Sequence, residues 1–154
     1  MICPIEAIRE AIVNATAHRD YFFDGAHTTV DIFDDRIEIS NPGGLPRGLN
    51  KENFGKKAVR RNQLIASLLQ RVNLVENMGT GINKIKSLLK GNGNIEPLFE
   101  FNSFYTIIFK RENGGINGGI NIDEVFLPII PKSLWVFINL LSNIVILSLL
   151  HLSL

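Results

Sequence analysis

The sequence predicts an α/β fold of two layers, in which helices pack over a mostly antiparallel sheet. Three observations support this prediction: a helical period over residues 4–18, an alternating pattern over residues 28–40, and further helical and strand patterns that follow. The chain has 154 residues, of which 45% are hydrophobic and 20% charged. This composition is typical of a folded protein and suits one domain with a hydrophobic core.

The first predicted helix covers residues 4–18. Pro4 suits a first helical turn, and the isoleucines that follow it fall on one side of the helix. Glu10 and Asn14 lie four residues apart on the other side. The helix is therefore amphipathic and carries a small polar stripe.

Two strands joined by a tight turn are predicted next, at residues 28–33 and 36–40. Apolar and polar residues alternate on both sides of Asp34 and Asp35, which is the pattern of a β-hairpin. The following segment, residues 41–48, reads NPGGLPRG, and this concentration of proline and glycine cannot continue a strand.

Helical periodicity returns over residues 62–76 and 81–90. The segment between them contains NMGTG, residues 77–81, which is a second glycine loop directly before a helix. A last strand is predicted at residues 104–111, FYTIIFKR. The expected order is thus helix, hairpin, glycine loop, helix, glycine loop, helix and strand.

Two features set the C-terminal part apart from residues 1–111, which we expect to form the folded domain. Residues 112–123 contain the short repeat NGGINGGIN, which is typical of a linker. Residues 124–154 form an apolar tail, and residues 134–154 contain no Asp, Glu, Lys or Arg. Three alternatives remain open for this tail: a membrane span, a buried helix, or a segment that does not fold natively.

The charges are unevenly placed, although the formal net charge is only +1. Residues 47–90 carry 10 basic and 2 acidic side chains, whereas residues 1–46 carry 3 and 8. An anionic partner for the middle segment would explain this asymmetry, and so would a solvated basic face. The single cysteine, Cys3, cannot form an internal disulfide, so a cytoplasmic location is the simpler expectation.

The polar stripe and the glycine loops have chemistry that suits one phosphate ligand. Glycine loops let backbone N–H groups approach an anion, and a helix that begins directly after such a loop points its positive end at the same place. The amide oxygen of Asn14 is a ligand suited to Mg²⁺, and the carboxylate of Glu10 can orient a water for attack on phosphorus. The sequence therefore predicts a nucleotide site.

Three separated segments, EAIREAIVNATAHRDY, DRIEISNPGGLP and ENMGTGINKI, occur in this order between residues 4 and 111. Together they resemble the Bergerat-fold, or histidine-kinase-like, ATPases, whose first motif is E-x-x-x-N and whose lid motif is often G-T-G. More narrowly, they resemble the RecG-related C-terminal module of predicted transcriptional regulators and ATP-dependent helicase-like proteins. The chain looks like a truncated copy of that module.

The resemblance implies that ATP and Mg²⁺ are the cofactors, with Asn14 as the metal ligand and Glu10 as the catalytic base. It assigns further residues to nucleotide binding: His18, Ser40, Asn41, Gly43, Gly44, Lys56, Gly79, Thr80 and Gly81. One departure stands out in the second motif, where Ser40 occupies the position of the superfamily's adenine-reading aspartate. A serine hydroxyl still accepts a hydrogen bond from an exocyclic amine, but it lacks the charge that strengthens the bond.

Two functions remain in view. The first is an ATP-binding regulatory module with slow or no hydrolysis. The alternative is a non-enzymatic DNA-binding or protein-interaction domain that has lost the nucleotide, with DNA held through residues 47–61. A truncated start also leads us to expect dimerisation, because it would remove elements that cover the sheet.

Overall fold

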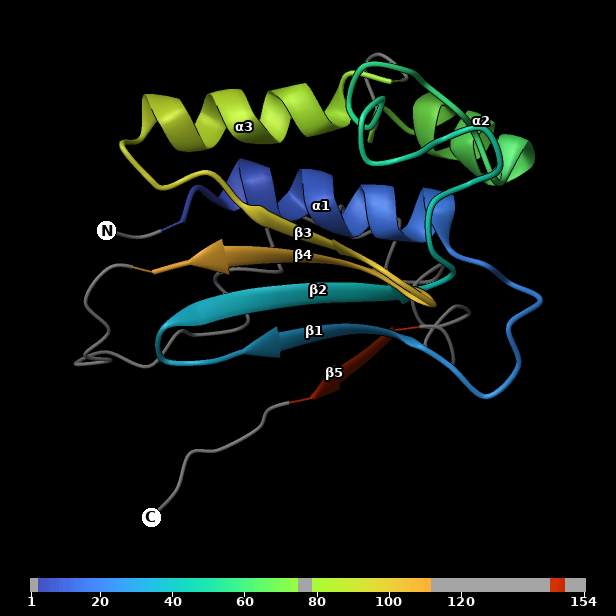
Figure 1. The fold of residues 1–154 in the computed structure, drawn as a ribbon, viewed down its shortest axis with the longest axis horizontal. Helices are drawn as coiled ribbons and strands as arrows, with labels where there is room; N and C mark the ends of the chain where they lie inside the picture. The colour runs from blue at the N-terminus through green and yellow to red at the C-terminus, as the bar shows by residue number, and fades with distance from the viewer. Residues whose placement is uncertain (1–2, 75–78, 112–144, 149–154) are drawn as a thin grey trace.

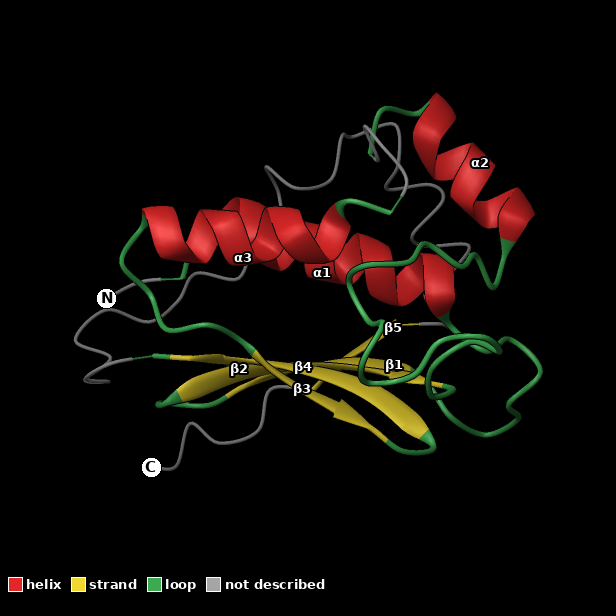
Figure 2. Ribbon diagram, turned by 45° about the horizontal axis from the view of Figure 1, so that its top comes forward, coloured by secondary structure: helices red, strands yellow, loops and turns green. Residues whose placement is uncertain are grey.

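The structure is a computed structural model that describes residues 3–74, 79–111 and 145–148 (Figure 1). Its elements follow the chain in this order: α1 (Ile5–His18), β1 (Thr28–Ile32), β2 (Arg36–Pro42), α2 (Gln63–Arg71), α3 (Gly81–Gly91), β3 (Leu98–Phe101), β4 (Phe104–Lys110) and β5 (Val145–Ser148). The strands form one sheet in the order β3-β4-β2-β1-β5, and only the β1–β5 pair is parallel. All three helices lie on one side of this sheet (Figure 2). The predicted two-layer α/β fold is confirmed.

The core lies between the sheet and α1. The side of α1 that faces the sheet carries alanines, and small side chains let a helix approach a sheet closely. Ile39 of β2 and Ile107 of β4 form a cross-strand pair beneath α1, and both are fully buried. The core cluster also contains Ala7, Ala11 and Ala15 of α1, and Ile85 and Leu89 of α3.

Glu10, in the polar stripe of α1, is covered by protein. α1 packs against β2 on one side and against α3 on another, so Glu10 is only 9% exposed. We expected a helix with one buried face, but α3 buries a second face that includes Glu10. Glu10 therefore faces α3 and not the solvent. This contact explains the presence of a carboxylate on a helix that is otherwise rich in apolar residues.

α2 is shorter than predicted. The pattern suggested a helix over residues 62–76, but α2 ends at Arg71. Asn73 has a φ of 56°, and the N–H groups of Asn73 and Leu74 donate to the carbonyls of Gln70 and Leu69 at 3.0 Å. These two bonds form a Schellman motif, in which a left-handed residue closes the last turn of a helix. Residues 75–78 lie outside the described part of the chain.

Two strands were not predicted. β3 is short, and it follows the loop after α3 and pairs with β4. β5 falls within the apolar tail, where its four residues pair with β1. None of the three alternatives for the tail included a strand. The predicted linker and the rest of the tail lie outside the described residues, so the proposed domain boundaries stay predictions. In the part of the chain that the structure describes, no helix has the length and apolar character to cross a bilayer.

Core truncation should have a much larger effect on stability than truncation at the edge of the sheet. Ile107→Ala removes a fully buried side chain and should lower the free energy of unfolding by about 2–5 kcal/mol. Leu98→Ala, at a side chain that is 48% exposed on the edge strand β3, is the control and should lose less than about 1 kcal/mol. Urea unfolding of both variants measures this difference. Equal losses would mean that the core is not where the structure puts it.

Candidate functional site

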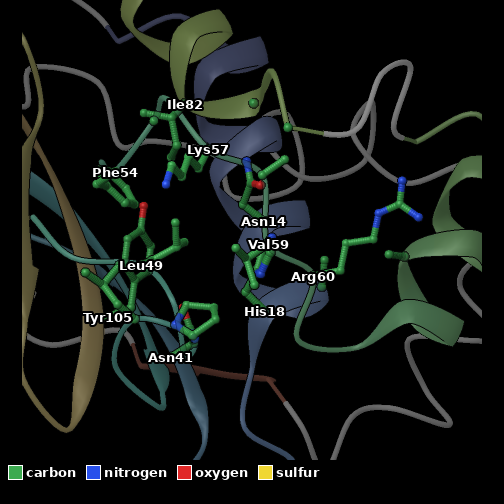
Figure 3. Close-up of a pocket in the computed structure, with 18 of the residues that line it drawn as sticks. Asn14, His18, Asn41, Leu49, Phe54, Lys57, Val59, Arg60, Ile82 and Tyr105 are labelled. Carbon is green, nitrogen blue, oxygen red and sulfur yellow. The ribbon is translucent and has the colours of Figure 1, made fainter. Parts of the chain in front are cut away.

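A pocket lies where α1, the end of β2 and the beginning of α3 converge (Figure 3). Its free volume is about 120 Å³, and the hollow together with the solvent at its mouth is about 1050 Å³. A long connection, residues 45–60, forms one wall, and we call it the lid segment. The lining residues are Glu10, Val13, Asn14, Ala17 and His18 of α1; Asn41, Gly43 and Gly44; Leu45, Pro46, Leu49, Phe54, Gly55, Lys57, Ala58, Val59 and Arg60 of the lid segment; Ala66 of α2; Gly79, Gly81 and Ile82; and Tyr105 of β4.

The polar stripe of α1 forms one side of the pocket. Glu10, Asn14 and His18 are spaced by four residues, which puts them on one face of the helix. The Asn14 amide nitrogen donates to the Glu10 backbone carbonyl at 2.9 Å. The Glu10 carboxylate oxygen Oε2 lies 3.5 Å from the ammonium of Lys84 on α3. The stripe is therefore oriented by contacts within α1 and with α3.

Gly81, the first residue of α3, fits directly against this stripe. A Cβ at this position would lie 2.5 Å from Asn14 Nδ2 and 2.8 Å from Glu10 Oε1, so only glycine fits without displacing these side chains. The first N–H groups of a helix have no partners within the helix, and they carry its positive dipole end. The N-terminus of α3, which attracts anions, thus lies beside Asn14 and Glu10. The sequence analysis assigned these two residues to metal binding and catalysis.

The loop after β2 forms the far end of the pocket. Gly43 has a φ of 92°, which favours glycine, and a Cβ there would overlap the Arg61 guanidinium. A Cβ on Gly44 would overlap the carbonyl oxygen of Asn102. Both glycines therefore allow a close approach between the loop and its neighbours.

Asn41, and not Ser40, faces the pocket. Successive side chains of a strand point to opposite sides, and Ile37, Ile39 and Asn41 are the residues of β2 on the buried, helix-facing side. The Ser40 hydroxyl pairs with the Thr106 hydroxyl at 2.8 Å on the other side of the sheet. Ser40 therefore does not line the pocket, whereas Asn41, which the resemblance also assigned to nucleotide binding, does.

The Asn41 side chain is fully buried, but it is poorly satisfied. Its amide nitrogen makes one long hydrogen bond of 3.3 Å to the carbonyl of the adjacent Pro42. Its amide oxygen has no hydrogen-bond partner among the described residues. Buried polar atoms in folded proteins are nearly always paired, so an unpaired acceptor in a pocket indicates a place for a donor.

Asp20 and Arg61 join three parts of the site, whereas the sequence analysis placed Arg61 only within the basic segment of residues 47–61. The Asp20 backbone N–H donates to the Pro42 carbonyl at 2.8 Å, and the Arg61 guanidinium donates to the Gly44 carbonyl at 2.7 Å. The two side chains approach to 4.0 Å.

Burial lowers the pKa of His18, and the nearby positive charge of Arg61 lowers it further. His18 is therefore neutral at physiological pH and can act as a hydrogen-bonding group in the pocket.

Two other predicted residues lie apart from the pocket. Lys56 is exposed and is not a lining residue, whereas its neighbour Lys57 does line the pocket. Thr80 is the exposed N-cap residue of α3, between Gly79 and Gly81, which both line the pocket. The Arg60 guanidinium points away from the pocket (Figure 3).

The apolar wall was missed by sequence reasoning. Phe54 of the lid segment and Tyr105 of β4 face α1 across the pocket (Figure 3). Burial raises the pKa of the Tyr105 phenol, which therefore stays protonated. The aromatic spacing in LFEFNSFY, residues 98–105, was the available signal, because alternate aromatic residues on paired strands share a face.

The metal prediction can be compared with the side chains that are present. Among the described residues, no three His, Cys, Asp or Glu side chains gather as a metal site. Mg²⁺ does not need such a group, because it is commonly held by one or two protein ligands together with phosphate and water. The Asn14 amide nitrogen is bonded to Glu10, which leaves the amide oxygen Oδ1 as the end suited to a cation. The site thus fits a Mg²⁺ ion carried by a phosphate ligand.

The chain was compared with known proteins. No curated protein matches it. Among solved structures, the crystal structure of the DIP2311 protein from Corynebacterium diphtheriae is similar, with a TM-score of 0.66 and 25% sequence identity. The match covers 72% of this chain but 23% of the DIP2311 chain, so this chain spans about a quarter of that protein's length.

One family model also matches, over residues 25–109, and its description is "Putative ATP-dependent DNA helicase recG C-terminal". The matched range includes the loop after β2, the lid segment and Gly79 to Gly81, and it begins after α1. Glu10, Asn14 and His18 therefore join the site through the fold and not through the matched range. Because the match covers more than half of the chain, this protein belongs to the RecG C-terminal family, as the sequence motifs indicated.

Proposed function

We propose that this chain is an ATP-binding regulatory module with slow or no hydrolysis. The observation that carries the proposal is the amide oxygen of Asn41, a fully buried acceptor in the pocket with no partner among the described residues. The exocyclic amine of adenine is a donor of the kind this oxygen lacks. The Asn41 amide nitrogen can donate to the adjacent ring nitrogen, so one side chain would read two atoms of the base.

The opposite end of the pocket would hold the phosphates. The N-terminus of α3 and the glycines that precede it supply backbone N–H groups and a positive dipole end. Lys57 of the lid segment lines the pocket and adds a positive charge. The base at Asn41 and the phosphates at Gly81 would then occupy two ends of one site.

Asn14 and Glu10 would handle the metal and the water. Asn14 Oδ1 would hold Mg²⁺, which supplies charge neutralisation at the phosphate oxygens when it is bound. Glu10 Oε1 lies toward Gly81, where it can orient a water, while Oε2 is engaged by Lys84. The contact with Lys84 leaves one of the two carboxylate oxygens of Glu10 for a water.

The wider role is also part of the proposal. We propose that residues 1–111 form the nucleotide-binding domain, with residues 112–123 as a linker, and that the chain works in the cytoplasm, where ATP is available. The family description mentions an ATP-dependent DNA helicase. This description supports the proposal that the module regulates a protein that acts on DNA. Occupancy of the pocket would be the regulatory signal.

Binding and hydrolysis should separate in two variants of α1. Asn14→Ala should remove the Mg²⁺-dependent increase in melting temperature that ATP produces, because a ligand stabilises the native state only if it binds. Glu10→Gln should keep that increase and lose any hydrolysis, since the amide cannot accept the proton from water. Thermal melts with and without Mg-ATP, together with a phosphate-release assay, measure both effects. A Glu10→Gln variant that hydrolyses ATP at the parental rate would remove Glu10 from the mechanism.

Asn41→Ala should weaken ATP binding and lower stability less than Ile107→Ala does. Loss of the bond to the base should weaken the affinity by about tenfold, the usual effect of one hydrogen bond. The truncation leaves a cavity and removes one long hydrogen bond, but it also removes a buried oxygen that is unpaired in the protein without ligand, and these effects oppose each other. Ser40→Ala is the matched control at the neighbouring position and should leave the affinity unchanged. Calorimetric titration and urea unfolding distinguish this result from a structural role, in which Asn41→Ala would mainly destabilise the fold.

A second candidate function is DNA binding, and one observation favours it. The lid segment exposes Lys51, Lys56 and Arg60 on one connection. Such a surface binds phosphates with an affinity that falls as salt rises. Reversal of these three charges to glutamate should abolish retention of duplex DNA at low salt, whereas Lys90→Glu and Lys110→Glu, at exposed lysines elsewhere, should not. Equal losses in both sets, measured by gel shift, would indicate nonspecific attraction to the whole chain.

A further inference from the structure

The lid segment is attached to the sheet by one aromatic side chain. The Phe54 ring lies 4.7 Å from the Phe101 ring and 5.1 Å from the Phe99 ring, both in edge-on orientations, and 6.0 Å from the Tyr105 ring. Phe99 and Phe101 belong to β3, and Tyr105 belongs to the neighbouring strand β4. Aromatic pairs at these separations are favourable beyond the area they bury. We call these four rings the aromatic cluster.

Asn53 links the turns of the lid segment over residues 48–53. The Asn50 N–H donates to the Asn53 side-chain oxygen at 2.8 Å, and the Asn53 N–H donates to the Asn50 side-chain oxygen at 3.0 Å. The Asn53 amide nitrogen also donates to the Gly48 carbonyl at 3.2 Å. These bonds do not involve the Phe54 ring, so they are independent of its contacts with the sheet.

Other attachments of the lid segment are weak or steric. The Asn83 side chain donates to the Gly55 carbonyl at 3.3 Å in an exposed position. Ala58 fits against Gly79, where a Cβ would lie 2.5 Å from the Ala58 Cβ. Among the described residues, the aromatic cluster is the ring–ring contact that joins this segment to the sheet.

The lid segment keeps the free volume of the pocket small. The free volume of the pocket is about 120 Å³, whereas pockets that enclose ligands of drug size measure roughly 300–1,000 Å³. Phe54 and Leu49 line the pocket on the side opposite α1 (Figure 3). An outward movement of this wall is the change that enlarges the pocket without disturbing the core.

We propose that Phe54 is an autoinhibitory latch, which holds the lid segment against the sheet and lowers the pocket's affinity for its ligand. The proposal rests on the proposed nucleotide function for the identity of that ligand. If only a fraction of molecules is open, the apparent affinity is reduced by that fraction. Loss of the latch then tightens binding, which is the opposite of what loss of a ligand contact does.

The experiment compares Phe54→Ala with Phe101→Ala in the full chain. Phe101 contacts Phe54 but does not line the pocket. It also packs on Tyr105 at 5.9 Å, so exchange of the β4 amides must stay unchanged for its effect to be assigned to the latch. Both variants should bind Mg-ATP about tenfold more tightly than the parent by calorimetric titration. Both should also accelerate hydrogen exchange of residues 49–57 without nucleotide, and the double variant should show less than the sum of the two effects.

The matched control is Phe23→Ala. Phe23 is also partly exposed and contacts the sheet through Phe104 at 5.6 Å, but it is not part of the lid segment or the pocket lining. It should change neither the affinity for Mg-ATP nor the exchange of residues 49–57. Exchange of β4 amides in every variant checks that the sheet is intact.

Each outcome decides one of the two proposals. Unchanged exchange of residues 49–57 in both variants overturns the latch, whatever the affinity. Faster exchange with weaker ATP binding in Phe54→Ala also overturns it and makes Phe54 a ligand contact. Faster exchange with no ATP binding in any variant or in the parent supports the latch as a closing contact and overturns the proposed ATP function.

Discussion

The contact between Gly81 and the polar stripe of α1 is the constraint on which the rest of the site depends. It places the beginning of α3 against Asn14 and Glu10, and no residue larger than glycine fits there without displacing them. Because α3 begins at this point, Lys84 reaches Glu10 one turn later, and Ile85 and Leu89 enter the core. One glycine therefore fixes both the anion-attracting helix end and the packing that buries the carboxylate.

The sequence predicted the elements with strong periodicity and the motifs that meet in the pocket. The isoleucine spacing located α1, the alternation around Asp34 and Asp35 located the hairpin, and the two glycine loops located the pocket ends. These signals are local, so they can be interpreted without knowledge of the fold. The same holds for Asn14 and Glu10, whose common face follows from helix geometry alone.

What the sequence did not predict depends on contacts between distant residues. Which of Ser40 and Asn41 lines the pocket follows from which side of β2 faces the helices, and that side is set by contacts with distant residues. Arg61 acquires its role only because the loop after β2 passes beside it. β3 is too short to produce a pattern, and its aromatic residues gain meaning only when Phe54 packs on them.

The alternation along β2 also separates two kinds of evolutionary change. Asn41 faces the pocket, and Ser40 faces the other side of the sheet, where it bonds to Thr106. Under the proposed function, paired substitutions at Ser40 and Thr106 would leave ligand choice unchanged, whereas a single change at Asn41 would alter it. Relatives that bind another ligand should differ at Asn41 and the glycines after it. Relatives that bind the same ligand should vary instead at Ser40, on the opposite side of the same strand.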